Sequence, residues 1–443
     1  MKYKHLALVL SMMYANFASA TTLNEALSLA YTNSQPLKVA QQTFIGEIQS
    51  ISEALSGFMP RIGAEIGVTD TQQVRPASSS IINKMTRNLQ ITQPLFNGGG
   101  TVAAVKAAQS SFRASKEKLY STEQEIMVQA VDAYLSYYEA KESYEISNTS
   151  VEFNQQTFDA TEERLKLGEA TLTDVALARA KLAKAQADRA MASANLQSTK
   201  ALNIKIFGTE LTDLVLPEIP SGVPDTLDSL TQKAVTQNPI LQATKNSLSA
   251  AKSNSFASKA ALLPSADLGV SVGTNYEDPT IASNSKKSMI TTLTVHIPIL
   301  SKGGAEYAAV RRANSAARAA AHQLEDQLGS VKANAIGAWE GYQASKAAIT
   351  FAEEAAEASA LALDGVKHEY AVGSKTIIDV LDAESQMNRY KIDNITTKKN
   401  YILAAYKIKA SIGECTAKAM HLPVKYFKPE AEFQKVKAKI IGF

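Results

Sequence analysis

The sequence predicts a mainly α-helical protein in which a helix–β-hairpin–helix repeat occurs twice, and three observations carry this prediction. The 443 residues include only 21 Gly and 13 Pro, which suits long helices better than a turn-rich fold. Four short segments alternate apolar and polar residues, as strands with two different faces do. Several motifs recur about 205 positions further along the chain, which indicates an internal duplication.

Residues 1–20 have the features of a secretory signal peptide. Lys2 and Lys4 precede an apolar run, and Ala18-Ser19-Ala20 provides an A-x-A cleavage site before Thr21. The alternative, a transmembrane anchor, is disfavoured because the apolar run is too short to span a bilayer. We therefore expect the chain to be exported and the fold to begin after this segment.

Charge balance and cysteine content exclude several classes of protein. Lys and Arg number 46 and Asp and Glu number 43, so the charge gives no argument for nucleic-acid binding. Cys415 is the only cysteine, so no intramolecular disulfide can form. We expect no catalytic site, cofactor or intrinsic metal site, because the histidines of the mature chain lack metal-type spacing. These histidines are His296, His322, His368 and His421.

The duplication divides the chain into two repeats, at 21–208 and 226–413, joined by a linker at 209–225 and followed by a tail at 414–443. Three pairs of matching stretches define the relation between the repeats. They are "NSQP" at 33–36 with "TQNP" at 236–239, "QPLFNGGG" at 93–100 with "IPILSKGG" at 297–304, and "KLGEATLTDV" at 166–175 with "AVGSKTIIDV" at 371–380.

Each repeat is expected to contain a helix, a β-hairpin and a long helical hairpin, in that order. Thr22 and Glu25 form the T-x-x-E capping box that begins the first helix. In repeat 1 the elements are predicted at 22–57, 58–96 and 98–208, with the tip of the helical hairpin at 168–171. In repeat 2 they are predicted at 226–261, 262–300 and 303–413, with the tip at 373–376.

Strand and helix lengths together predict the architecture. The strands are about ten residues long, as tilted transmembrane strands are, although a soluble sheet would show the same alternation. The helices decide between the two, since 101–167 would be roughly 100 Å long, more than a compact domain holds. Four strands cannot close a barrel, and open sheet edges are not viable in lipid. We therefore expect a homotrimer with a 12-stranded transmembrane β-barrel on a long α-helical barrel.

At this point the sequence resembles a known family. The signal peptide, the duplicated plan and the motif "YAVGSKTIIDVLDAE" at 370–384 are similar to those of the TolC family of outer-membrane channel-tunnels. The resemblance implies a trimer in the outer membrane of a Gram-negative bacterium, with its helical tunnel in the periplasm. It also implies docking, through a periplasmic adaptor (membrane fusion protein), to an inner-membrane ABC or proton-driven transporter.

The resemblance implies an exit duct for type I protein secretion, small-molecule efflux or both. The sequence does not distinguish these cargoes. The alternative is a periplasmic coiled-coil adaptor or scaffold without a pore. Two amphipathic β-hairpins argue against it, because an adaptor needs no lipid-facing strands.

Both hairpin tips show a helix that stops and restarts. Gly168 and Gly373 can adopt the left-handed conformation that ends a helix. Thr171 with Asp174, and Thr376 with Asp379, can cap the helix that follows. Turn formation alone explains these residues, so they are weak evidence for a role in gating.

The second tip differs from the first at three positions, and these suggest function. Tyr370, Lys375 and Asp382 replace apolar residues of the first tip, which are Leu165, Ala170 and Leu177. Asp382 follows Asp379 by one helical turn and shares its face. In a trimer that face would present a ring of carboxylates that attracts cations and is open to blockage by multivalent cations. A solvated helix face is the alternative.

The resemblance also implies a latch that holds the tip closed. Lys375 and Tyr370 would bond to the first tip, with Thr173 and Asp174 as acceptors. The family's pattern has arginine where this chain has Lys375. The guanidinium group of arginine can make two parallel hydrogen bonds to one acceptor group, whereas the ammonium group of lysine acts as a point charge. A weaker latch is therefore expected.

We predict that Lys375→Ala or Tyr370→Phe raises the single-channel conductance, because each removes one side of the latch. Recordings in planar lipid bilayers measure this directly. Conductance equal to that of the unsubstituted protein would count against the latch.

Overall fold

The structure is a computed structural model that describes residues 22–75, 78–276 and 285–437. The predicted signal peptide lies outside the described residues. In this part of the chain no helix combines the length and apolar composition needed to cross a bilayer.

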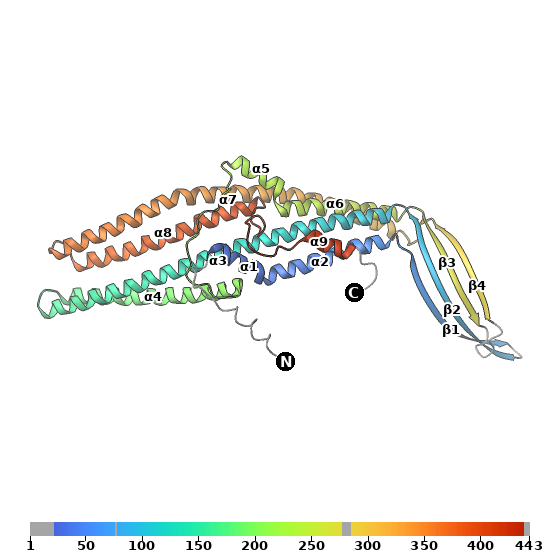
Figure 1. The fold of residues 1–443 in the computed structure, drawn as a ribbon, viewed down its shortest axis with the longest axis horizontal. Coiled ribbons are helices and arrows are strands. Elements are labelled where there is room, and N and C mark those ends of the chain that lie inside the picture. Colours follow the sequence, from blue (N-terminus) through green and yellow to red (C-terminus); the bar gives the residue numbers. More distant parts are fainter. Residues whose placement is uncertain (1–21, 76–77, 277–284, 438–443) are drawn as a thin grey trace, which may run out of the picture. The chain divides into compact units, whose positions relative to one another are not determined.

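The described elements follow the predicted order twice (Figure 1). The first set is α1 (Leu23–Asn33), α2 (Gln35–Ser56), β1 (Arg61–Arg75), β2 (Ser78–Asn97), α3 (Gly100–Lys166) and α4 (Leu172–Phe207). The second set is α5 (Leu227–Gln237), α6 (Pro239–Ala260), β3 (Ser265–Tyr276), β4 (Ser285–His296), α7 (Ala305–Ala371) and α8 (Ile377–Ser411), and α9 (Pro429–Lys437) follows. The long helices α3 and α7 have 67 residues each.

The first helix of each repeat is broken, where the sequence predicted one continuous helix. Ser34 separates α1 from α2 and has a non-helical ψ angle of 114°. Asn238 separates α5 from α6 and has a non-helical ψ angle of 121°. Pro36 and Pro239 explain the breaks, because each lacks the N–H that a continuous helix would use. Proline is tolerated in the first turn of α2 and α6, where that N–H has no helical partner.

The described chain forms two compact units, and neither coincides with a sequence repeat. The helical unit contains residues 22–40, 120–239 and 329–427, including α4, α8 and both tips. The strand unit contains residues 41–119, 240–328 and 428–437, including all four strands. Each unit therefore combines segments from both repeats.

The strand unit is built around one antiparallel sheet in the order β1-β2-β3-β4 (Figure 1). Pairing of β2 with β3 joins the hairpins of the two repeats. Ile62 lies opposite Ile91, which lies opposite Val270, so these apolar residues share one face of the sheet. Other large apolar side chains of the strands are strongly exposed, including Ile66 at 71% and Met289 at 72%. This much exposed apolar surface calls for a non-aqueous neighbour.

The turn from β2 into α3 depends on glycine. Gly98 has a φ of 64°, and a Cβ there would lie 2.6 Å from the carbonyl oxygen of Ala260. Only glycine meets both demands without strain. The "NGGG" motif is therefore explained by a close strand-to-helix turn.

Two asparagines beside the breaks in the short helices tie the helical unit together. Asn33 Nδ2 donates to the carbonyl of Phe207 at 2.6 Å, and Asn238 Nδ2 donates to that of Ser411 at 2.9 Å. Both carbonyls lie at the end of a helix, where the helix itself offers no donor. The repeats thus use the same side chain to fasten their short helix to the end of their returning helix.

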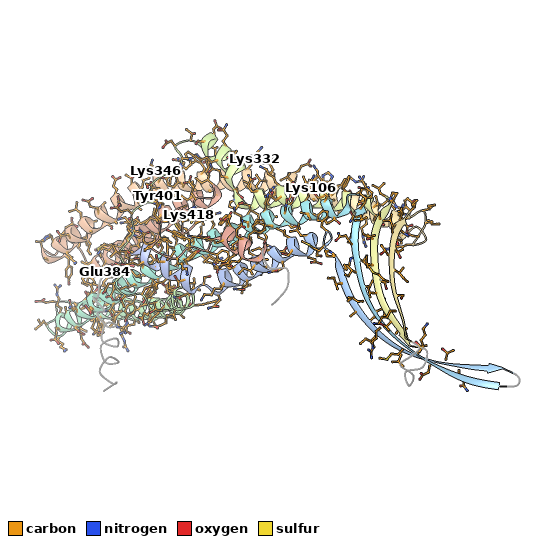
Figure 2. All side chains as sticks on the ribbon, turned by 45° about the vertical axis from the view of Figure 1, so that its right-hand side comes forward. Lys106, Lys332, Lys346, Glu384, Tyr401 and Lys418 are labelled. Atoms are coloured by element: carbon orange, nitrogen blue, oxygen red, sulfur yellow. The ribbon has the colours of Figure 1, made fainter. Side chains whose placement is uncertain are left out.

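Helix α8 also packs against α3 and α7 in this unit. Lys399 lies 2.9 Å from the Glu139 carboxylate of α3. Tyr401, labelled in Figure 2, stacks on Tyr342 of α7 with ring centroids 5.2 Å apart. These contacts fasten the part of α8 that lies away from the tip to α3 and α7.

The described part of the tail, residues 414–437, makes specific contacts with other parts of the chain. In the helical unit, the Ala417 N–H donates to Glu123 at 2.7 Å, and the Phe427 N–H donates to the Tyr31 hydroxyl at 3.0 Å. In the strand unit, Phe433 of α9 packs on Phe112 with ring centroids 5.0 Å apart. Residues 414–427 are therefore part of the helical unit, and residues 428–437 are part of the strand unit.

Burial raises the pKa of Glu123 to about 7, although the Ala417 N–H opposes this shift. As the pH rises from about 4.5 to 7, the unfolded chain loses a proton that folded Glu123 retains, so stability falls. Glu123→Gln keeps an acceptor for Ala417 but cannot titrate. It should reduce this fall by an amount on the order of 3 kcal/mol.

Unfolding midpoints of the detergent-solubilised protein between pH 5 and 8 measure this effect. Glu125→Gln, at an exposed position of α3, is the matched control and should leave the pH dependence unchanged. Identical pH profiles for Glu123→Gln and the unsubstituted protein would show that the carboxyl does not titrate as described.

Candidate functional site

The candidate site lies at the two hairpin tips of the helical unit, which have the same backbone conformation. Gly168 and Gly373 have φ angles of 78° and 79°. The N–H of Gly168 donates to the carbonyl of Leu165, and that of Gly373 to the carbonyl of Tyr370, both at 3.0 Å. A Cβ at either glycine would meet no atom within 4 Å, so the left-handed conformation alone requires glycine.

Each returning helix begins with the predicted capping box. The Thr171 N–H donates to Asp174 at 2.9 Å, and the Thr376 N–H donates to Asp379 at 2.8 Å. These backbone hydrogen bonds lower the pKa of Asp174 and of Asp379. The positive charge of Lys375 lowers the pKa of Asp379 further. Asp379 is therefore a half-buried, charged residue that is held by its own helix.

Tyr370, one of the predicted latch residues, contacts Arg164. The Arg164 guanidinium of α3 donates to the Tyr370 hydroxyl of α7 and lies 5.3 Å from its ring centroid. Within the described residues, no hydrogen bond joins Tyr370 to Thr173 or Asp174. The single chain thus makes a different link between the tips, and the bonds of Tyr370 and Lys375 to Thr173 and Asp174 remain a prediction.

Asp382, the second acid of the predicted ring, forms an ion pair with Lys181. The Lys181 Nζ atom of α4 lies 2.5 Å from Asp382 Oδ1 of α8. Sequence reasoning missed both Arg164 and Lys181. The available signal was that each is a basic residue close to the first tip, within reach of an antiparallel partner hairpin.

A buried carboxyl group lies one step further along α8. Glu384 is 5% exposed and accepts a hydrogen bond from Asn154 of α3 at 3.4 Å (Figure 2). Asn388 of α8 donates to the same carboxyl group. Burial raises the pKa of Glu384, and these hydrogen bonds oppose the shift. Glu384 therefore fastens α8 to α3 through a satisfied polar contact.

The hairpin α3/α4 is thus joined to the hairpin α7/α8 by three polar contacts near the tips. They are Arg164 with Tyr370, Lys181 with Asp382, and Asn154 with Glu384. A small apolar cluster lies within the first hairpin, formed by Val151, Phe158, Leu182 and Ala185. The partly exposed contacts of Arg164 and Lys181 contribute little stability each, whereas the buried contact between Asn154 and Glu384 is costlier to break.

Comparison with known proteins identifies the family. The family described as outer membrane efflux protein matches residues 26–202 and 230–414. The chain belongs to this family. The two matched segments correspond to the two repeats, which confirms the resemblance and the duplicated, mainly helical fold. The predicted location in the outer membrane and the general role in export are also confirmed.

Individual relatives match along most of their length. The chain is 28% identical to the outer membrane efflux protein BepC of Brucella suis biovar 1 (strain 1330), over 96% of this chain and 92% of BepC. It is 24% identical to the outer membrane protein TolC of Escherichia coli (strain K12), over 90% of this chain and 84% of TolC. The similarity therefore extends across both repeats.

Solved structures show the same fold. The outer-membrane channel OprN has a TM-score of 0.78 at 17% identity, over 88% of this chain and 89% of OprN. The Campylobacter jejuni CmeC outer membrane channel has a TM-score of 0.79 at 16% identity, over 94% of this chain and 89% of CmeC. Both of these similar structures are outer-membrane channels.

We predict that Arg164→Gln and Tyr370→Phe each raise the single-channel conductance, and that the double variant adds little to either. The two residues form one contact, so their effects should not be additive. Planar bilayer recordings of the unsubstituted protein, the two single variants and the double variant measure how far the two effects on conductance depend on each other.

Lys166→Gln is the matched control, because Lys166 pairs only with Glu163 of its own helix among the described residues. It should leave the conductance unchanged. Additive effects of Arg164→Gln and Tyr370→Phe would mean that the contact does not restrain the tip.

Proposed function

We propose that three copies of this chain form one channel-tunnel, with a 12-stranded β-barrel in the outer membrane and an α-helical tunnel in the periplasm. The four-stranded sheet carries this proposal. β1 and β4 lie at its edges in the described chain, so each has a row of backbone groups available for another strand. Pairing β1 of one chain with β4 of the next would satisfy both rows and close the barrel.

The two faces of the sheet support a lipid neighbour outside and water inside. One face carries most of the exposed apolar side chains of the strands, while the other carries Gln90 opposite Ser271 and Asn88 opposite Gly273, together with exposed Ile290. In a closed barrel the apolar face would contact lipid and the polar face would line a water-filled channel.

We propose that a groove between α7 and α8 receives a helix of the periplasmic adaptor. The groove has a volume of about 380 Å³ and lies close to the second tip. Alanines of α7 line one side, which allows a partner helix to approach closely, while Gln386 and Tyr390 of α8 offer polar contacts. The adaptor would connect the duct to an inner-membrane ABC or proton-driven transporter that supplies the energy.

The tips would form the periplasmic entrance of the tunnel. In this assembly Asp379 and Asp382 form the acidic ring, Tyr370 and Lys375 form the latch with Thr173 and Asp174, and Gly168 and Gly373 form the turns. Opening requires the two hairpins of each chain to move apart. The cargo would be secreted proteins, small toxic molecules or both; one relative is a pyoverdine export protein of Pseudomonas putida.

Fractionation, bilayer recording and gene deletion test this proposal. We expect the protein in the outer-membrane fraction and ion-conducting pores from the purified protein. Deletion should reduce the secreted proteins, increase sensitivity to detergents and drugs, or both, which identifies the cargo. Recovery from the soluble periplasm without pores would instead indicate an adaptor or scaffold.

A further inference from the structure

The two acids of the proposed entrance ring are held in different ways. Asp379 caps α8 through Thr376, three residues before it, so its environment belongs to one helix. Asp382 instead pairs with Lys181 of the other hairpin. Movement of one hairpin against the other would leave Asp379 unchanged but would remove the partner of Asp382.

Packing between α4 and α8 positions this ion pair. Ala178 and Leu182 are buried on α4, and Leu381 is buried on α8. Lys181 directly precedes Leu182, and Asp382 directly follows Leu381. Each member of the pair is therefore next to a buried apolar residue, on two helices that contact each other.

The ion pair is better suited to neutralising charge than to fastening the helices. The Lys181 side chain is 37% exposed and that of Asp382 is 61% exposed, and such pairs contribute about 0 to 1 kcal/mol. At 2.5 Å, however, the ammonium cancels most of the carboxylate's field. An unpaired charge acts over a Debye length of about 8 Å at physiological salt. Pairing therefore strongly reduces the electrostatic attraction between the carboxylate and a passing cation.

The pair occurs in only one of the two repeats. Leu177 occupies the position in repeat 1 that matches Asp382, and Gln386 occupies the position in repeat 2 that matches Lys181. A trimer would therefore contain three such pairs, all in the second acid position of the ring. Its three Asp379 residues would remain without a basic partner from the other hairpin.

We propose that Lys181 masks Asp382 while the hairpins are together, and that opening of the entrance unmasks it. The resting entrance then has the cation attraction of one acid per chain, and the open entrance has that of two. Lys181 is thus a selectivity-determining residue whose influence ends when the tip opens. This inference rests on the proposed trimeric channel.

Block by La³⁺ and reversal potentials in a KCl gradient, recorded from the full protein in planar bilayers, test the inference. Lys181→Gln, which places the residue of repeat 2 at this position, should tighten La³⁺ block several-fold and shift the reversal potential toward that of K⁺. Asp382→Asn alone should change both little, whereas Asp379→Asn should weaken the block. Asp382→Asn added to Lys181→Gln should abolish the gain.

Lys184→Gln is the matched control, because Lys184 pairs with Asp188 of its own helix. It should leave block and selectivity unchanged. The inference is overturned if Lys181→Gln leaves La³⁺ block unchanged, or if Asp382→Asn weakens it as much as Asp379→Asn does.

A second arm tests the dependence on opening. In the Arg164→Gln background, where the tips are released, La³⁺ block should already be tighter and Lys181→Gln should add nothing. An equal effect of Lys181→Gln in both backgrounds would contradict unmasking. If the unsubstituted protein forms no pore, the channel proposal fails; if it conducts but Lys181→Gln has no effect, only the masking fails.

Discussion

Backbone hydrogen bonding at the edges of the four-stranded sheet is the constraint on which the rest of the assembly depends. Each unpaired N–H or C=O group in lipid costs several kcal/mol, and β1 and β4 present such groups along their outer sides. The apolar face of the sheet makes water an equally poor neighbour. One chain cannot satisfy both demands, whereas three chains in a closed barrel can. Threefold symmetry would then bring three copies of each tip around one axis.

The tips show how a duplicated backbone acquires a specific role. Both turns use glycine and a T-x-x-D cap, so the local fold is the same in the two repeats. The differences are in side chains that reach the other hairpin, namely Tyr370, Asp382 and Glu384, with Arg164, Lys181 and Asn154 as their partners. The turn residues thus maintain the local fold, while the residues that differ make the contacts between the hairpins.

Local signals in the sequence were sufficient for most of the fold. Capping boxes, glycine stops and strand alternation involve residues only a few positions apart, so helix ends and hairpins could be predicted. The breaks at Ser34 and Asn238 were missed because proline in a first helical turn resembles proline outside a helix. Arg164 and Lys181 were missed for another reason. Their contacts depend on the register between helices about 200 residues apart, which tertiary packing sets and no local pattern records.

Disulfide cross-linking between β1 and β4 tests closure of the barrel most directly. A cysteine replacing Glu65 would be combined with single cysteines along 287–295, and the native thiol should not interfere because burial raises the pKa of Cys415 to about 12. Closure predicts covalent trimers for one register of the paired positions and none for cysteines on the same strand. Absence of cross-links between chains at every position, in protein extracted from the outer membrane, would contradict the trimeric barrel.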